Sequence, residues 1–125
     1  MNIFFLAAGL LLLLLSIAHA LWGETRLFKL LTPPAADGET FVSLYVPWHQ
    51  ITYLLAASGM ALIYSAIQGG ASSLTYFVLA IVAGNFSLFI LICLIKGQTQ
   101  LFKKTIPQTV LFLLLIMLII LGTIS

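Results

Sequence analysis

Two histidines and one glutamate are the side chains of this sequence that are best suited to chemistry. His19, Glu24 and His49 stand out in a chain of 125 residues that is otherwise largely apolar. Two imidazoles and a carboxylate form the ligand set of some catalytic zinc sites and of the non-haem iron facial triad. The same groups can also relay protons within a membrane. We therefore take His19, Glu24 and His49 as the candidate ligand, metal or proton site.

A structural role is the favoured interpretation of these residues. His19 and His49 lie near the ends of apolar segments and beside Trp22 and Trp48, where amphipathic rings gather at a membrane interface. His19 and Glu24 are five residues apart, so about 140° separates them around a helix of 100° per residue. They share a face only if the helix ends between them. We expect interfacial anchoring or hydrogen bonds between helices and no cofactor, with a metal or haem site as the alternative.

The composition decides the environment of these side chains. Hydrophobic residues make up 62% of the chain and charged residues 6%, against about 45–50% and about 25% in ordinary soluble domains. Five basic and three acidic side chains cannot cover a soluble surface, so a soluble enzyme and a disordered chain are excluded. Nucleic acid is not expected as a partner, because the net charge is only +2. Motifs of soluble catalysis, such as a His-Glu-x-x-His pair, are absent, which argues against an enzyme.

Four apolar segments are long enough to cross a lipid bilayer. They are Ile3–Trp22, Trp48–Ile67, Leu74–Ile95 and Ile106–Ile124. A helix of about 20 residues spans roughly 30 Å of hydrocarbon at 1.5 Å per residue. Continuous apolar runs are typical of helices, whereas strands of a membrane barrel alternate. The sequence therefore predicts an all-α membrane protein, a single four-helix bundle over residues 1–125.

The basic residues predict how the chain is oriented. Arg26 and Lys29 lie between the first and second spans, and Lys96, Lys103 and Lys104 lie between the third and fourth. Neither terminus carries Lys or Arg, and nor does the turn between the second and third spans. The positive-inside rule then places both basic loops in the cytoplasm and both termini outside. We expect an integral protein of the bacterial inner membrane.

The cytoplasmic loop of residues 23–47 is the largest part outside these spans. Its first residues are expected to continue the first helix along the interface, until Thr32-Pro33-Pro34 stops it. Asp37 has the position of a helix N-cap. Phe41–Val46 would then form a helical lead-in to the second span, kinked near Pro47.

Small residues four positions apart predict which helix faces meet, because they let helix backbones approach closely in a membrane. The positions are Ala57, Ala61 and Ser65 in the second span, and Ala80 and Gly84 in the third, with the polar Asn85 beside them. A tight turn at residues 68–73 makes these spans an antiparallel hairpin, so we expect the two faces to meet, with Asn85 bonding between helices. The first and last spans lack such faces and are expected outside. A homo-oligomer formed through the small faces is the alternative.

Two short segments carry a family resemblance. They are His19-Ala20-Leu21-Trp22-Gly23-Glu24-Thr25-Arg26 and Trp48-His49-Gln50-Ile51-Thr52. The pattern resembles a group of small, uncharacterised bacterial inner-membrane proteins with four predicted spans. In that group a His-x-x-x-Gly-Glu segment closes the first span and Trp-His opens the second. Ala20 stands where we expect Ser. The resemblance implies a bacterial four-helix protein, draws attention to His19, Glu24 and His49, and supplies no activity.

These features together favour a small accessory or structural subunit, packed against other membrane protein subunits or copies of itself. The prediction rests on the lack of any soluble domain, on the bulky first and last spans, and on the scarcity of charge. The rival is a bundle that handles a ligand, metal or proton through His19, Glu24 and His49. A transporter or channel ranks last, because Asn85 alone lies near the midplane.

Overall fold

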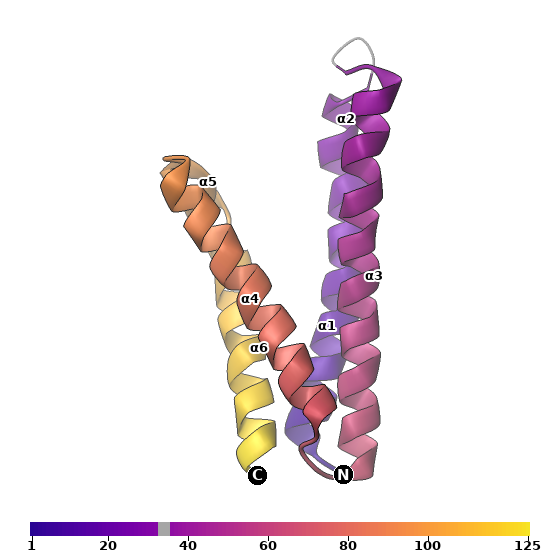
Figure 1. Cartoon of the computed structure of the whole chain (residues 1–125), viewed down its shortest axis with the longest axis vertical. Helices are drawn as coiled ribbons and strands as arrows, with labels where there is room; N and C mark the ends of the chain where they lie inside the picture. Colours follow the sequence, from indigo (N-terminus) through magenta and orange to yellow (C-terminus); the bar gives the residue numbers. More distant parts are fainter. Residues whose placement is uncertain (33–35) are drawn as a thin grey trace.

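The computed structural model describes residues 1–32 and 36–125, and its long elements are all helices (Figure 1). Four helices are long and apolar enough to cross a membrane, and the described residues include no strand. The predicted all-α membrane architecture is confirmed to that extent. The elements are α1 (Ile3–Trp22), the π-helix η1 (Gly23–Leu27), α2 (Phe28–Leu30), α3 (Gly38–Gln68), α4 (Ser73–Ile95), the short α5 (Thr99–Lys104) and α6 (Ile106–Ile124).

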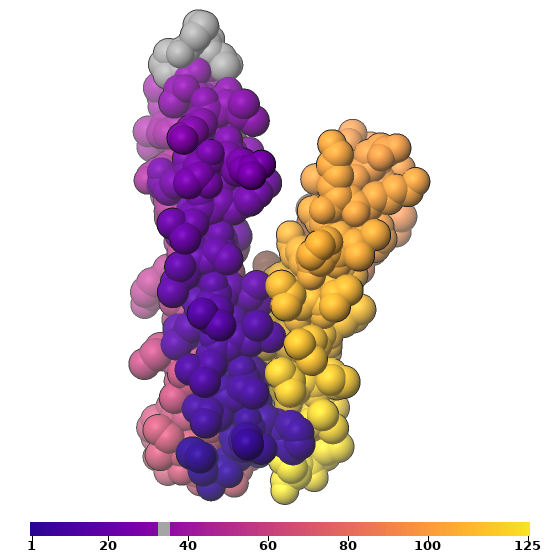
Figure 2. Space-filling view, turned by 180° about the vertical axis from the view of Figure 1, so that it is seen from behind, coloured from indigo at the N-terminus to yellow at the C-terminus, as the bar shows by residue number. Residues whose placement is uncertain are grey.

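The helices form two arms that meet at one end and diverge toward the other (Figure 1). The long arm consists of α1, η1, α2 and α3, and the short arm of α4, α5 and α6. Both termini and the turn between α3 and α4 lie at the end where the arms meet, which we call the closed end. At the open end, α2 and α5 lie apart. A space-filling view from behind shows the gap between the arms (Figure 2).

The long arm extends further than its two predicted spans. α3 begins at Gly38 rather than Trp48 and has 31 residues, with Pro47 inside it. The N-cap prediction is confirmed, because the Asp37 side chain accepts the backbone N–H of Thr40 at 2.7 Å. The predicted continuation of the first helix and the predicted helical lead-in to the second span are also confirmed, because η1 and α2 follow α1 and because α3 includes residues 41–46. Pro33 and Pro34 of the predicted stop lie outside the described residues.

The two helices of the long arm cross at a pair of glycines. A Cβ built on Gly9 would lie 2.7 Å from the carbonyl oxygen of Gly59, and one on Gly59 would lie 2.8 Å from that of Gly9. Only glycine allows backbones to approach so closely. Leu12 and Leu62 are fully buried beside the crossing. The first span was expected outside, and this was wrong, since α1 packs against both α3 and α6.

The small-residue faces of α3 and α4 do not meet within the chain. Ala80, Gly84 and Asn85 are exposed, in the sense that the chain itself does not cover them, and a Cβ on Gly84 would meet nothing within 4 Å. On α3, Ala57 is exposed, Ala61 is half-buried, and Ser65 is buried. The predicted pairing was wrong because α3 turns Gly59 toward α1. The Asn85 amide donates to Ile81 of its own helix at 2.9 Å instead of to another helix.

The closed end is held by Asn2, which joins three helices. Its backbone N–H donates to the carbonyl of Ala66 at 2.9 Å, and its side-chain amide donates to the carbonyl of Gly122 at 2.8 Å. Its side-chain oxygen caps α1 by accepting the backbone N–H groups of Phe4 and Phe5. The Phe5 ring lies on Gly122, where an added Cβ would be 2.5 Å from the ring. The arms are therefore fixed to each other at this end.

Candidate functional site

A π-helical turn places the candidate residues. Over Gly23–Leu27 the helix widens, and the backbone N–H of Phe28 donates to the carbonyl of Gly23, five residues earlier. The Trp48 indole packs so closely on Gly23 that a side chain there would overlap it. The helix therefore does not end between His19 and Glu24, because it continues through Gly23. Such π-turns occur frequently at functional sites.

Glu24 and His49 lie together across the long arm. His49 Nε2 is 3.0 Å from Glu24 Oε1, and the Tyr45 hydroxyl donates to the same oxygen. The His49 and Glu24 side chains are 31% and 47% exposed, so the pair lies at the surface of the chain. The carboxylate thus bridges η1 to two side chains of α3. Tyr45 was not among the predicted site residues, although its position four residues before His49 puts both on one helix face.

His19 has different partners from Glu24. Its Nδ1 lies 2.9 Å from the Thr52 hydroxyl, and its ring stacks on the Trp48 indole with centroids 4.0 Å apart and planes at 11°. The indole N–H of Trp48 donates to the backbone carbonyl of His19 at 3.1 Å. The separation of His19 from Glu24 around the helix therefore persists. His19 joins α1 to α3 at a level closer to the closed end.

Aromatic rings surround the carboxylate bridge. Phe28 is buried, and its ring lies edge-on to Tyr45 with centroids 4.9 Å apart, and edge-on to Phe41 and Trp48. Trp22 stacks on Trp48 at 5.6 Å. These rings hold η1 and α2 on α3. The spacing of residues 41, 45 and 48 along one helix face was the signal available in the sequence.

The three candidate residues do not form one metal site. Within residues 1–32 and 36–125, no three His, Cys, Asp or Glu side chains are grouped so that they could hold a metal ion. Glu24 and His49 supply two ligands, but the imidazole of His19 is turned to Thr52. The arrangement instead offers one carboxylate oxygen that accepts the Tyr45 hydroxyl and lies within hydrogen-bond distance of the His49 ring.

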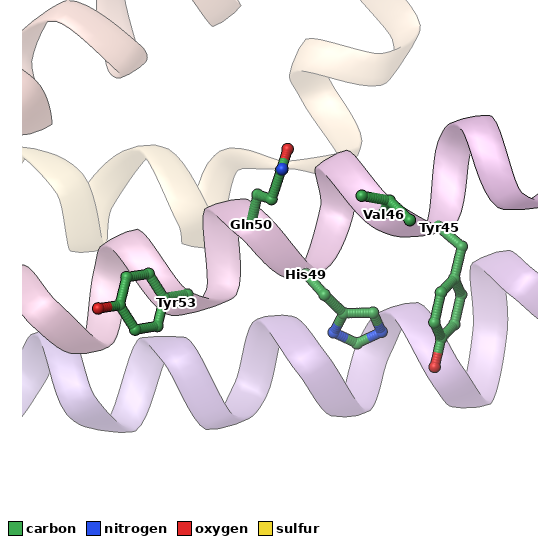
Figure 3. A pocket seen from close by; sticks show the side chains of 5 residues that line it. All are labelled: Tyr45, Val46, His49, Gln50 and Tyr53. Atoms are coloured by element: carbon green, nitrogen blue, oxygen red, sulfur yellow. The ribbon is translucent and has the colours of Figure 1, made fainter.

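A shallow, open depression of about 500 Å³ lies beside this pair (Figure 3). Five residues of α3 line it: Tyr45, Val46, His49, Gln50 and Tyr53. Tyr45 and His49 point toward the neighbouring helix, and Gln50 points away from it (Figure 3). The depression combines polar groups with an apolar floor, as expected at the boundary of a membrane.

Comparisons with known proteins do not indicate a function for this chain, so its function has to be inferred from the geometry. No protein-family model matches the chain, and no curated protein or solved structure shows significant similarity to it. The resemblance carried by the His19–Arg26 and Trp48–Thr52 segments therefore stays a prediction.

Proposed function

We propose that the protein is a small polytopic membrane subunit that packs against another membrane protein or against copies of itself. The observation that carries this proposal is the uncovered small-residue face of α4. Ala80 and Gly84 each follow a buried valine, Val78 or Val82, by two residues, which is about 200° around the helix. They therefore face away from the rest of the chain. Small residues at such a face favour close contact with another membrane helix.

The location proposed for this subunit is the bacterial inner membrane, with both termini outside the cytoplasm. All five basic residues lie in η1, α2 and α5 or directly after the end of α4, which are the parts of the chain at the open end. The closed end carries both termini and no Lys or Arg. The positive-inside rule then supports a cytoplasmic open end.

Two matched substitutions test the proposed contact. Ala80→Leu adds bulk to the outward face of α4, and Ala7→Leu makes the same change at an exposed alanine of α1. In mild detergent, we expect the wild type and Ala7→Leu to be recovered in an assembly larger than one chain. Ala80→Leu should be recovered as the single chain. A wild type that is a monodisperse monomer, or an unchanged Ala80→Leu assembly, would contradict the proposal.

The second candidate function is handling of a ligand, metal or proton at Glu24 and His49. It is favoured by the pairing of these side chains at a π-turn, next to the open depression on α3. Metal analysis and an optical spectrum of the purified protein test it. If the bound species is lost in His49→Ala alone, its site consists of Glu24 and His49. If it is also lost in His19→Ala, His19 belongs to the site as well. A wild type without any bound species, and without a phenotype in either variant, would remove this candidate.

A further inference from the structure

The gap between the two arms, which we call the wedge, is a feature of the open half of the molecule. All buried residues of α6, namely Leu115, Ile119 and Gly122, lie in its second half, and none of residues 106–114 is buried. The buried residues in the first half of α4 are Thr75, Val78 and Val82. In its second half, Cys93 alone is buried, and it lies near α5. The arms therefore pack on each other only near the closed end, and the wedge opens beyond it (Figure 2).

The open halves of the helices that border the wedge are apolar. Their exposed side chains include Leu14, Ile17, Leu88, Leu91, Val110 and Leu113. Such surfaces exclude water and favour hydrocarbon. In a bilayer, either lipid acyl chains or the side chains of another helix must fill this space.

Basic residues lie at the wide end of the wedge. Arg26 and Lys29 belong to the long arm, and Lys96, Lys103 and Lys104 to the short arm, and all five are exposed. Arg26 and Lys96 each lie 23 residues after the start of α1 and α4, respectively, which is about 35 Å along a helix. Both arms thus bring positive charge to a similar level, close to one membrane interface.

The acidic residues do not neutralise this charge on the short arm. Residues 73–125 contain three lysines and no Asp or Glu. On the long arm, Glu24 is already bonded by Tyr45 and His49, and Asp37 and Glu39 lie at the tip, where α3 begins. The rim of the wedge therefore suits an anion.

We propose that the wedge binds an anionic phospholipid. Its acyl chains lie between the arms, and its phosphate accepts hydrogen bonds from the basic side chains of α5 and of the long arm. The charge decides between the occupants. A second copy would bring an equally basic open end against this one, and an apolar helix would leave the lysines without partners. The lipid lies on the inner side of α4, away from Ala80 and Gly84, so this proposal and the proposed subunit contact can fail separately.

Native mass spectrometry of the full chain in mild detergent tests the proposal with two lipid probes of equal chain length. We expect one phosphatidylglycerol to stay bound to the chain at least about tenfold more tightly than phosphatidylcholine. Lys103→Gln with Lys104→Gln should remove most of that preference, at about fivefold per basic residue, whereas Lys103→Arg with Lys104→Arg should keep it. Arg26→Gln with Lys29→Gln should weaken binding as well, because the headgroup lies between the arms.

Fluorescence of Trp22 and Trp48 reports the position of the lipid from the long arm. Phosphatidylglycerol with brominated chains should quench these tryptophans more strongly than brominated phosphatidylcholine at equal mole fraction in vesicles. The difference should vanish when the two α5 lysines, on the opposite arm, become glutamine. Equal quenching by both lipids in the wild type, or no effect of the long-arm double substitution on binding, would overturn the proposal. A lipid-free dimer or a co-purified helix in the wedge would do so too.

Discussion

The two arms use small residues in different ways. In the long arm, Gly9 of α1 faces Gly59 of α3, and the two backbones touch. In the short arm, Gly84 of α4 faces no part of the chain. The space beside Gly122 of α6 is occupied by the Phe5 ring of the long arm. In this chain, two helix backbones touch where a glycine of one helix faces a glycine of the other.

The arms also differ in what holds them beyond the closed end. The long arm has a second set of contacts in its open half, where Phe28 and the Glu24 bridge join η1 and α2 to α3. The short arm has one aromatic pair, Phe86 and Phe112, with ring centroids 5.7 Å apart. The long arm is thus held at two levels by tightly packed groups, and the short arm much more loosely.

The largest expected effect comes from removing the ring at the centre of the long arm's open half. Phe28→Ala deletes a buried ring that contacts several other rings. We expect this change to lower the free energy of unfolding by about 3 kcal/mol. Phe112→Ala, at a half-buried ring, should cost about half as much by the same argument. Hydrogen exchange in mild detergent should show opening confined to η1, α2 and the start of α3. Equal costs in the two arms would contradict the comparison.

A glycine-to-alanine pair tests the backbone contact itself. Gly9→Ala places a Cβ 2.7 Å from a backbone oxygen, so the helices must move apart at a cost of about 1–3 kcal/mol. Gly84→Ala meets nothing within 4 Å and should leave the free energy of unfolding unchanged, or raise it by up to about 1 kcal/mol through helix propensity. Reversible unfolding in mixed detergent, followed by circular dichroism, measures both. A loss of stability in a monomeric Gly84→Ala chain would contradict the comparison.

The sequence predicts the helices of this fold better than their pairing. Continuous apolar runs define four helices, and Asp37 marks the true start of α3. Pairing is harder because Ala57, Ala80 and Gly84 are suitable for close packing without specifying a partner. Gly9, which lies between two alanines and a run of leucines, gave no recognised pattern, although it is the residue at which α1 and α3 touch. Asn2 also gave no signal, since its partners lie up to 123 residues away.

The candidate site was predictable in part, for a related reason. Glu24 and His49 flank apolar segments of opposite direction, so the sequence places them at a similar depth, and the structure brings them into contact. Periodicity assumes 3.6 residues per turn throughout, however, and cannot reveal the π-turn that carries Glu24. The partner of His19 was not predictable either, because Thr52 competes with a ligand for the same ring nitrogen.

A smaller effect is expected at the junction between the two arms. Asn2→Ala removes the side-chain hydrogen bonds to α6 and the cap of α1. We expect the free energy of unfolding to fall by about 1–2 kcal/mol. The arms should also vary more in their separation. Electron spin resonance distances between labels on the two arms measure this, while distances within each arm stay constant. Ser125→Ala removes one 3.1 Å bond from the same amide and should have a clearly smaller effect. A distance distribution unaffected by Asn2→Ala would show that other contacts fix the angle.

The smallest expected effect is a difference in pH dependence between the N-terminal caps of α3 and α4. The first cap is a carboxylate and the second is uncharged. The backbone N–H of Thr40 bonds to the Asp37 carboxylate and lowers the pKa of Asp37 below its ordinary value. The cap therefore stabilises α3 above the ordinary pKa of aspartate, about 3.9, and the stabilisation is lost as the pH falls through the lowered pKa. At the start of α4, the Ser72 N–H donates to the Thr75 hydroxyl at 3.0 Å, and neither group titrates. Amide exchange, corrected for its intrinsic pH dependence, should accelerate at Thr40 in acid and not at Ser72. The same acceleration in Asp37→Asn, which cannot titrate, would show that the cap is not the cause.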